Sequence, residues 1–226
     1  MTAPHRRALA LFAGGPRSTR LHTRLRWWWC PFPAIEAAVG DADDVLEVGC
    51  GHGLLSLYLA LARPGRRVTG VDIDEPKIAE AVAATAGLGA GEAQITFDVV
   101  APGYVPGPEA SWGAVVFADV LYLLPADEQR RLVEAAARAV SPLGVVVIKE
   151  MGLTPRWKAR WNRFQETMAT KVFRITDSVG AGLTFVAPEV MAGWLADEGL
   201  DVTSRRVDAG YPWPHNLIVA RRPAAR

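Results

Sequence analysis

Short apolar runs alternate with segments of helical periodicity from residue 44 to near the end of the chain. Apolar runs between Gly and Pro are typical of buried strands, and apolar positions three or four apart predict helices. Because the two kinds of segment alternate, we expect a sheet that is mostly parallel, with crossover helices. The predicted strands are 44–48, 67–71, 93–99, 114–118, 144–148, 201–207 and 216–220, and the predicted helices are 54–62, about 75–86, 125–140 and 188–198.

The strands differ in their expected surroundings. Strands 93–99 and 114–118 have the composition of strands buried on both faces. The last two strands, 201–207 and 216–220, are joined by a short connection and should pair antiparallel.

An insertion at 151–186 follows the fifth strand. Its apolar residues Trp157, Trp161, Phe164, Met168 and Val172 fall at helical spacing. This stripe predicts either a helix packed on the domain or a lid over a substrate.

Length and charge limit the number of domains and the kinds of partner. At 226 residues and 50% hydrophobic, the chain suits one domain. We divide it into an N-terminal basic and aromatic segment, 1–40, and a main domain, 41–226. The net charge of +1 argues against a broad nucleic-acid surface. The first thirty residues carry six Arg and no acidic residue, which predicts a solvated, partly disordered arm or one that touches an anionic substrate or membrane surface.

Cysteine and histidine usage indicates a reducing compartment and no metal. Cys30 and Cys50 are the two cysteines, too few for a disulfide framework, so a cytoplasmic location fits. The four histidines are widely separated, and nothing has metal-ligand spacing. We also expect neither an export signal nor a transmembrane segment.

The segment with the clearest chemistry is 45–53, an apolar strand that runs into three alternate glycines before a helix. Such glycines let the backbone approach a ligand closely, and tight turns require dihedrals that glycine adopts easily. Leu54 stands where a dinucleotide fingerprint would place its last glycine, which disfavours a nicotinamide cofactor. Glu47 lies within the strand, where a carboxylate can order the loop. Asp72 ends the second strand, in place to accept hydrogen bonds from two ribose hydroxyls.

These motifs, with residues 71–74, 116–124 and the closing strand pair, resemble the class I S-adenosylmethionine-dependent methyltransferases over about residues 40 to 220. The resemblance implies a Rossmann-like doubly wound α/β sheet, mostly parallel with an antiparallel last strand, in the order 3-2-1-4-5-7-6. It also implies S-adenosylmethionine as cofactor. A side chain at Gly49 or Gly51 would then occupy the cofactor's volume. The implied cofactor-binding residues are Glu47, Gly49, Cys50, Gly51 and Gly53 in the loop, Asp72 on the ribose, Ile73 against the adenine, and Ala118 and Asp119 near the methionine end.

One position departs from the family pattern. The family often has an Asp shortly after strand three that bonds the adenine amino group. Ala101 stands there, and Asp98 lies inside the strand instead. We therefore expect backbone near Val100 and Ala101 to hold the adenine.

Methyl transfer from a sulfonium is an in-line displacement, so positioning supplies much of the catalysis and a base is added where the acceptor must lose a proton. The candidate catalytic residues at strand ends are Glu150, Tyr122 and His215. Glu150 has an alternative role as the partner of a nearby Arg, and His215 as a hydrogen-bonded structural residue. His52, inside the turn, is expected to shape that loop.

Aromatic residues suggest the acceptor. If Trp27, Trp28, Trp29, the insertion aromatics, Tyr211 and Trp213 converge, the acceptor site is large and apolar, and otherwise they form an interfacial patch or ordinary packing. We expect metal-free methyl transfer to a small-molecule, natural-product or lipid-like acceptor, with peripheral membrane contact open and a monomer or homodimer. The alternative is a non-methylating reaction such as cyclisation, or binding alone. An NAD-dependent oxidoreductase ranks below both, and nucleic-acid modification ranks last.

Overall fold

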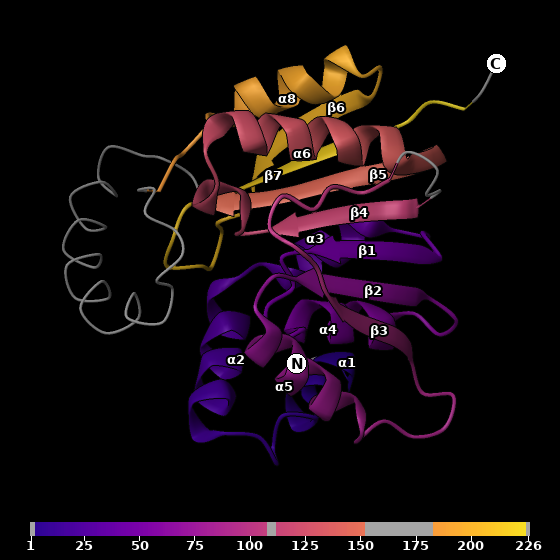
Figure 1. The fold of residues 1–226 in the computed structure, drawn as a ribbon, viewed down its shortest axis with the longest axis vertical. Helices are drawn as coiled ribbons and strands as arrows, with labels where there is room; N and C mark the ends of the chain where they lie inside the picture. The colour runs from indigo at the N-terminus through magenta and orange to yellow at the C-terminus, as the bar shows by residue number, and fades with distance from the viewer. Residues whose placement is uncertain (1–2, 108–111, 152–182, 225–226) are drawn as a thin grey trace.

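A single seven-stranded sheet forms the centre of the computed structural model, which describes residues 3–107, 112–151 and 183–224 (Figure 1). The strand order is β3-β2-β1-β4-β5-β7-β6, as predicted. The strands are β1 (Asp44–Val48), β2 (Arg67–Asp72), β3 (Gln94–Val99), β4 (Trp112–Ala118), β5 (Val140–Met151), β6 (Asp201–Arg206) and β7 (His215–Arg221).

The pairing pattern identifies the edge of the sheet at which open α/β folds bind their ligands. β3, β2, β1, β4 and β5 are parallel, whereas β7 pairs antiparallel with both β5 and β6. The chain leaves β1 towards β2 on one side, and β4 lies on the other side. The order of strands therefore reverses between β1 and β4. In open α/β sheets the carboxyl ends of the strands at such a reversal form the ligand crevice.

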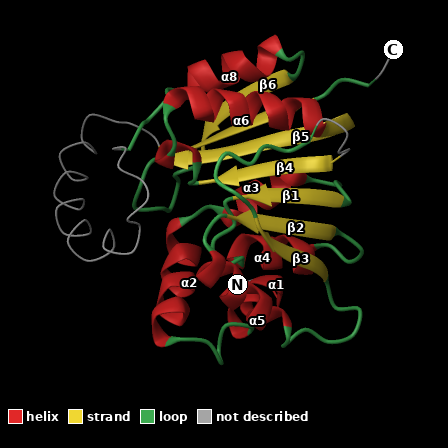
Figure 2. Ribbon diagram, viewed as in Figure 1, coloured by secondary structure: helices red, strands yellow, loops and turns green. Residues whose placement is uncertain are grey.

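Helices cover both faces of the sheet (Figure 2). α1, α3, α4 and α5 pack with one apolar cluster, and α6 and α8 pack with a second on the opposite face. The helices are α1 (Ala3–Ala10), α2 (Arg17–Trp29), α3 (Phe32–Val39), α4 (Leu54–Ala62), α5 (Glu75–Thr85), the short 3-10 helix η1 (Leu121–Leu123), α6 (Ala126–Ala139) and α8 (Pro188–Asp197).

Alternate side chains of each central strand belong to the two apolar clusters. On β1, Val45 belongs to the first cluster and Leu46 to the second, and both are fully buried. Successive side chains of a strand point to opposite faces, so a strand covered on both faces must be apolar at consecutive positions. The apolar runs read from the sequence are this pattern.

Two strand predictions need correction. β3 is not buried on both faces: it is the edge of the sheet, and Phe97 is its one buried residue. β5 is longer than predicted, because it begins at Val140 and continues to Met151, with an irregular register between Val140 and Val145 opposite β4. Leu143, at the irregularity, has a positive φ of 64°. Glu150 therefore lies inside a strand.

The N-terminal segment is folded from Ala3 onward, so the expectation of a partly disordered arm is wrong for the described residues. α1 packs on α4, and Ala8, Phe12 and Ile35 are buried in the first cluster. The sequence did not predict these helices, because each has few apolar positions and six arginines dominate the composition of the segment. The insertion stripe from Trp157 to Val172 lies outside the described residues.

Arg66 joins three segments at the end of the sheet opposite the ligand crevice. Its side chain is fully buried. The guanidinium donates to the carbonyls of Ala42 (3.0 Å) and Leu59 (3.1 Å) and to that of Gly40, the C-cap of α3. The bond to Leu59 is buried and the other two are partly buried, so one side chain supplies the donor for three carbonyls that water reaches little.

We predict that Arg66→Met lowers the free energy of unfolding by about 3 kcal/mol, because it leaves buried carbonyls without a donor. Arg67→Met is the matched control. Arg67 is exposed and pairs with Asp44, and a surface pair is worth at most about 1 kcal/mol. Urea unfolding of both variants measures the difference, and equal losses would contradict the anchoring role of Arg66.

Candidate functional site

The turn after β1 is built on glycines. Gly49, Gly51 and Gly53 all have positive φ, at 77°, 54° and 75°. The amides of Gly49 and Cys50 both donate to the carbonyl of Val71, at 2.8 and 3.0 Å. The loop is therefore fastened to the end of β2 and leads directly into α4.

The reasons for the glycines differ from position to position. A Cβ on Gly49 would lie 2.3 Å from the Val120 side chain, so that glycine makes room for the chain after β4. The expectation that a side chain there would fill ligand volume is wrong for Gly49. A Cβ on Gly51 would have only Lys77 within 4 Å, at 3.9 Å, so Gly51 borders open space. A Cβ on Gly53 would collide with the Phe97 ring.

Asp72 stands at the end of β2, beside this loop. Its Oδ2 accepts a hydrogen bond from the Gly51 amide (2.7 Å), and its Oδ1 accepts from the Asp74 amide (3.0 Å). The carboxylate is partly exposed. A carboxylate has about four acceptor positions, so two remain for hydroxyl groups of a ligand.

Apolar side chains flank Asp72 at the same edge. Ile73 is 52% exposed, and Val99, paired with Asp72 in the register of β2 and β3, is 50% exposed. The Val100 amide donates to the carbonyl of Asp72 (3.0 Å) and is therefore committed to the backbone, whereas Ala101 is exposed. The edge combines a carboxylate with apolar surface, which suits a nucleoside: hydroxyls on Asp72 and a flat base on the aliphatic groups.

Glu47 is buried under the loop rather than exposed to the crevice. It accepts a hydrogen bond from the Ser56 hydroxyl of α4. Burial raises the pKa of Glu47 to about 7, although the Ser56 hydrogen bond and the charge of Arg26 act in the opposite direction. Glu47 thus ties β1 to α4 beneath the glycine turn.

His52, in the same turn, contacts two neighbouring elements. Its Nε2 lies 3.6 Å from the Glu80 carboxylate of α5, and its ring centroid lies 5.0 Å from that of His22 on α2. These contacts agree with the expected role in shaping the loop.

A buried ionic cluster lies beside the loop, at the end of β4. Asp119, with a positive φ of 59°, accepts from the Lys149 ammonium (2.6 Å) and from the Arg26 guanidinium (2.9 Å). Arg26 also donates to the carbonyl of Ala118 (2.9 Å). Burial alone would raise the pKa of Asp119, but the charges of Lys149 and Arg26 lower it below its ordinary value. Ala118 and Asp119 are thereby fixed in one conformation.

Sequence reasoning missed Lys149 and Arg26. Lys149 sits inside an apolar strand, which was a usable signal, since a fully buried Lys needs a partner. Arg26 was one of six arginines in the N-terminal segment, and nothing local distinguished it.

Glu150 and Tyr122 lie on the α6 side of the sheet. Glu150 Oε1 accepts from the Leu121 amide (3.0 Å), and Oε2 has no hydrogen bond within the described residues. Burial, then the nearby charge of Asp119, raises the pKa of Glu150 to about 8. The alternative role for Glu150, an ion pair with an Arg, is absent among the described residues. Tyr122 stacks on Phe185 with ring centroids 5.4 Å apart, and burial raises the pKa of its hydroxyl.

His215 lies on the opposite side of the sheet from Glu150. In the β5–β7 register, Glu150 pairs with Asn216 and Met151 with His215, and paired residues share a face. His215 is buried on the side of Lys149, and burial followed by the Lys149 charge lowers its pKa to about 4. The structure therefore does not bring the candidate catalytic residues together as one group.

Trp27 is set apart from its neighbours Trp28 and Trp29 by its packing. Trp27 is partly buried against the first apolar cluster, stacked on His5 with ring centroids 3.6 Å apart and edge-on to Phe32 and Tyr58. Trp28 and Trp29 are exposed at 63% and 41%. Trp27 therefore has the ordinary packing role that the sequence left open, and for Trp28 and Trp29 the acceptor site and the surface patch stay open.

No described helix is both long and apolar enough to cross a membrane. The described residues also hold no group of three or more His, Cys, Asp or Glu arranged to hold a metal ion.

Comparisons with known proteins agree with this geometry. Residues 45–144 match the family model of a methyltransferase domain. The match covers less than half of the chain, and the strand order of the sheet is that of the class I methyltransferase fold. No curated protein matches the sequence.

Several solved structures share the fold of this methyltransferase domain at low sequence identity. Magnesium protoporphyrin IX methyltransferase (ChlM) from Synechocystis PCC 6803, with bound SAH, is 20% identical with a TM-score of 0.63, over 96% of this chain and 93% of that one. An O-methyltransferase family protein from Burkholderia thailandensis is 18% identical with a TM-score of 0.66, over 90% of this chain. This chain spans only 58% of that longer protein. The [4+2]-cyclase SpnF is 16% identical with a TM-score of 0.62, over 86% and 80% of the two chains.

The cofactor indicated by the family is S-adenosylmethionine, and the site fits it. Gly51 borders open space, Asp72 retains acceptor positions, and Ile73 and Val99 expose apolar surface at the same edge. Adenosine needs these three features.

The raised pKa of Glu47 yields a prediction about stability. The folded protein keeps a proton on Glu47 that the unfolded chain releases above about pH 4.5, so Glu47 makes stability fall as pH rises from about 4.5 to about 7. Glu47→Gln removes this contribution. The stability of wild type relative to the variant should decline by about 3 kcal/mol across that range and stay level above it.

Urea unfolding at a series of pH values, without added cofactor, measures this difference. Glu75→Gln, at an exposed position on α5, is the control for the substitution itself. A pH-independent difference for Glu47→Gln as well would show that Glu47 is ionised in the folded protein.

Proposed function

We propose that the protein binds S-adenosylmethionine and transfers its methyl group, without a metal, to a small-molecule, natural-product or lipid-like acceptor. The observation that carries the proposal is the edge formed by Asp72 with the glycine turn on one side and Ile73 and Val99 on the other. The Asp72 carboxylate suits the ribose hydroxyls of adenosine, and the apolar side chains suit its base.

The bound cofactor supplies an electrophilic methyl group on a sulfonium, and the protein's own residues orient it. Asp72 and the turn hold the nucleoside end. The Asp119 cluster fixes the chain after β4, next to the turn through the contact of Val120 with Gly49. Because in-line displacement depends on alignment, this rigidity supports catalysis by positioning.

Proton transfer is assigned by the pKa values of the candidates. His215, with a pKa of about 4, is neutral at pH 7 and a weak base. Tyr122 stays protonated. Glu150, with a pKa of about 8 and a free Oε2, holds a proton at pH 7 and becomes a base above pH 8. Among the three, Glu150 is therefore the candidate general base.

The remaining features of the proposal concern organisation. Residues 1–40 act as a helical cap on the main domain 41–226, and the ion pair of Arg26 with Asp119 joins this cap to the site. Cys30 and Cys50 are free and buried, which supports a reducing, cytoplasmic setting. The proposal holds for a monomer and for a homodimer. A non-methylating reaction such as cyclisation would use the same cofactor edge without releasing S-adenosylhomocysteine.

We predict that S-adenosylmethionine and S-adenosylhomocysteine bind the protein and that Asp72→Asn weakens both by about tenfold to a hundredfold. The loss follows from charge-assisted hydrogen bonds worth about 1.5–3 kcal/mol. Calorimetric titration measures it, with NADH as a third ligand. Asp201→Asn, an exposed position at the start of β6, is the control and should bind as wild type does. Binding of NADH with silence towards the other two ligands would overturn the proposal.

We predict that methyl transfer to an acceptor found by screening rises with pH and levels off above about pH 8 when the acceptor must lose a proton. Glu150→Gln should lower the rate by about a hundredfold and abolish the rise. Release of S-adenosylhomocysteine measures the rate, and Glu128→Gln on α6 is the control. A rise that persists in Glu150→Gln would assign the proton transfer to another group.

A further inference from the structure

One face of α2 presents large apolar and cationic side chains to solvent. Leu21 and Trp28 are 60% and 63% exposed, and Arg17 and Arg24 are also exposed. Their spacings of four, three and four residues place all four on one side of the helix. We call this stripe of Arg17, Leu21, Arg24 and Trp28 the α2 face. A soluble protein has no packing use for an exposed Trp and Leu beside arginines.

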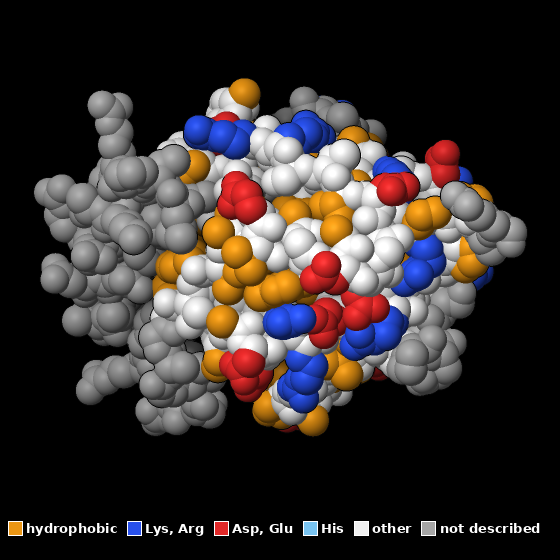
Figure 3. All heavy atoms as spheres, turned by 90° about the horizontal axis from the view of Figure 1, so that it is seen from above, with side chains coloured by type: hydrophobic (Ala, Val, Ile, Leu, Met, Phe, Trp, Pro, Cys, Tyr) orange, Lys and Arg blue, Asp and Glu red, His pale blue; other side chains and the backbone are white. Residues whose placement is uncertain are grey.

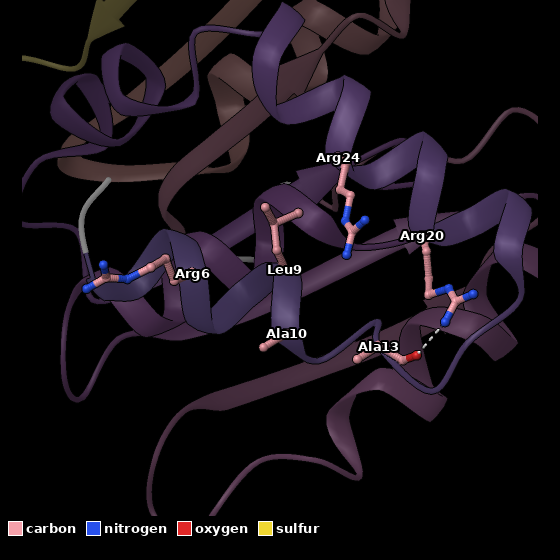
Figure 4. A pocket seen from close by; sticks show the side chains of 6 residues that line it. All are labelled: Arg6, Leu9, Ala10, Ala13, Arg20 and Arg24. Carbon is pink, nitrogen blue, oxygen red and sulfur yellow. Dashed lines mark hydrogen bonds between the residues drawn. The ribbon is translucent and has the colours of Figure 1, made fainter.

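A cationic hollow borders the α2 face, as Figure 4 shows. Its volume is about 280 Å³, and it lies between α1 and α2, lined by Arg6, Leu9, Ala10, Ala13, Arg20 and Arg24. Arg20 donates to the Ala13 carbonyl at 3.1 Å. Arg6 lies at the other end of the hollow and points away from Arg20 and Arg24. The arginines are thus spread over a surface, as suits several anionic groups rather than one small anion.

The charge of this region is unlike that of the rest of the protein. Residues 1–30 contain no acid, and Arg6, Arg17, Arg20 and Arg24 form no ion pair within the described residues. The end of the molecule that carries α8 mixes Lys and Arg with Asp and Glu, as Figure 3 shows. There Arg138 pairs with Glu198. Among the described residues, Arg6, Arg17 and Arg24 are therefore exposed cations without an acidic partner.

The α2 face also leads to the proposed site. On the buried side of the same helix, Arg26 holds Asp119, and the C-cap residue Cys30 lies 3.9 Å from the Asp119 carboxylate. A surface bound to the α2 face would therefore lie across the width of α2 from the Asp119 cluster.

We propose that the α2 face docks on an anionic lipid bilayer. Leu21 and Trp28 enter the interfacial layer, and Arg17, Arg24 and the arginines of the hollow bind lipid phosphates. Interfacial helices combine Trp and Leu with arginines in this way, and each Arg near an anionic membrane surface adds to the affinity.

Charge decides between a bilayer and a second copy of the chain. A two-fold contact of the α2 face with itself would place arginines against arginines, with no acid among the first thirty residues to separate them. A bilayer with phosphate headgroups provides the opposite charge across the whole face. The apolar and cationic residues therefore fit a lipid surface better than a self-contact.

Docking deepens the proposed function by naming the substrate class. The acceptor would be an amphiphile that resides in the bilayer and reaches the crevice from its edge, and this step rests on the proposed methyl transfer. The docking itself does not, because it involves none of the cofactor-binding residues.

Flotation of the full chain with vesicles tests the docking without cofactor or acceptor. One set of vesicles is phosphatidylcholine alone and the other contains about one third phosphatidylglycerol. We expect wild type to float with the anionic set. Both Leu21→Ser with Trp28→Ser and Arg17→Gln with Arg24→Gln should weaken binding by about tenfold or more. The control pair, Val190→Ser with Arg205→Gln on α8 and β6, should float as wild type does.

Three results would overturn the docking. The first is wild type that does not float with anionic vesicles, and the second is binding of these vesicles by both variants as tightly as by wild type. The third result is a wild-type dimer in sedimentation that Trp28→Ser abolishes. Titration of each variant with S-adenosylmethionine, in the absence of vesicles, separates the two proposals. Cofactor binding by wild type that does not float removes the docking and leaves the methyltransferase, whereas lost flotation with unchanged cofactor affinity is the result expected of the variants. Flotation without cofactor affinity does the reverse.

Discussion

The burial of Asp119 between Lys149 and Arg26 is the constraint on which the rest of the site depends. Each partner comes from a different part of the chain: Asp119 follows β4, Lys149 lies in β5, and Arg26 belongs to α2. Removing Asp119 would leave the buried Lys149 ammonium uncompensated, at a cost of about 3–5 kcal/mol. The N-terminal helices are therefore part of the site, since without Arg26 the carboxylate would lose one of its two cations.

That cluster also sets the acid and base properties around it. The charge of Asp119 helps to raise the pKa of Glu150, and the charge of Lys149 helps to lower that of His215, in both cases after burial. One carboxyl group stays ionised and its neighbour stays protonated because only the first has two cations in contact. Since β5 and β7 turn Glu150 and His215 to opposite faces, the two groups act on different surroundings.

The two halves of the proposed site are built by different means. The nucleoside end relies on backbone: the positive φ values of the glycines, the amides held by Val71, and the carboxylate held by two amides. The methionine end relies on side chains brought from distant segments. The first kind of construction leaves a compact local pattern in the sequence, and the second leaves almost none.

The sequence by itself determined the strand and helix pattern, the glycine turn at 49–53 and the carboxylate at Asp72, because each depends on neighbours within a few residues. Together with the family resemblance it led to the order of the sheet. Only the tertiary structure decided that Val120 is the reason for Gly49, that β3 is a bare edge, and that Lys149 and Arg26 share Asp119. It also decided that Trp27 packs on His5 while Trp28 is exposed. These depend on contacts between residues far apart in the chain, and alternation along one segment carries no record of what packs against it.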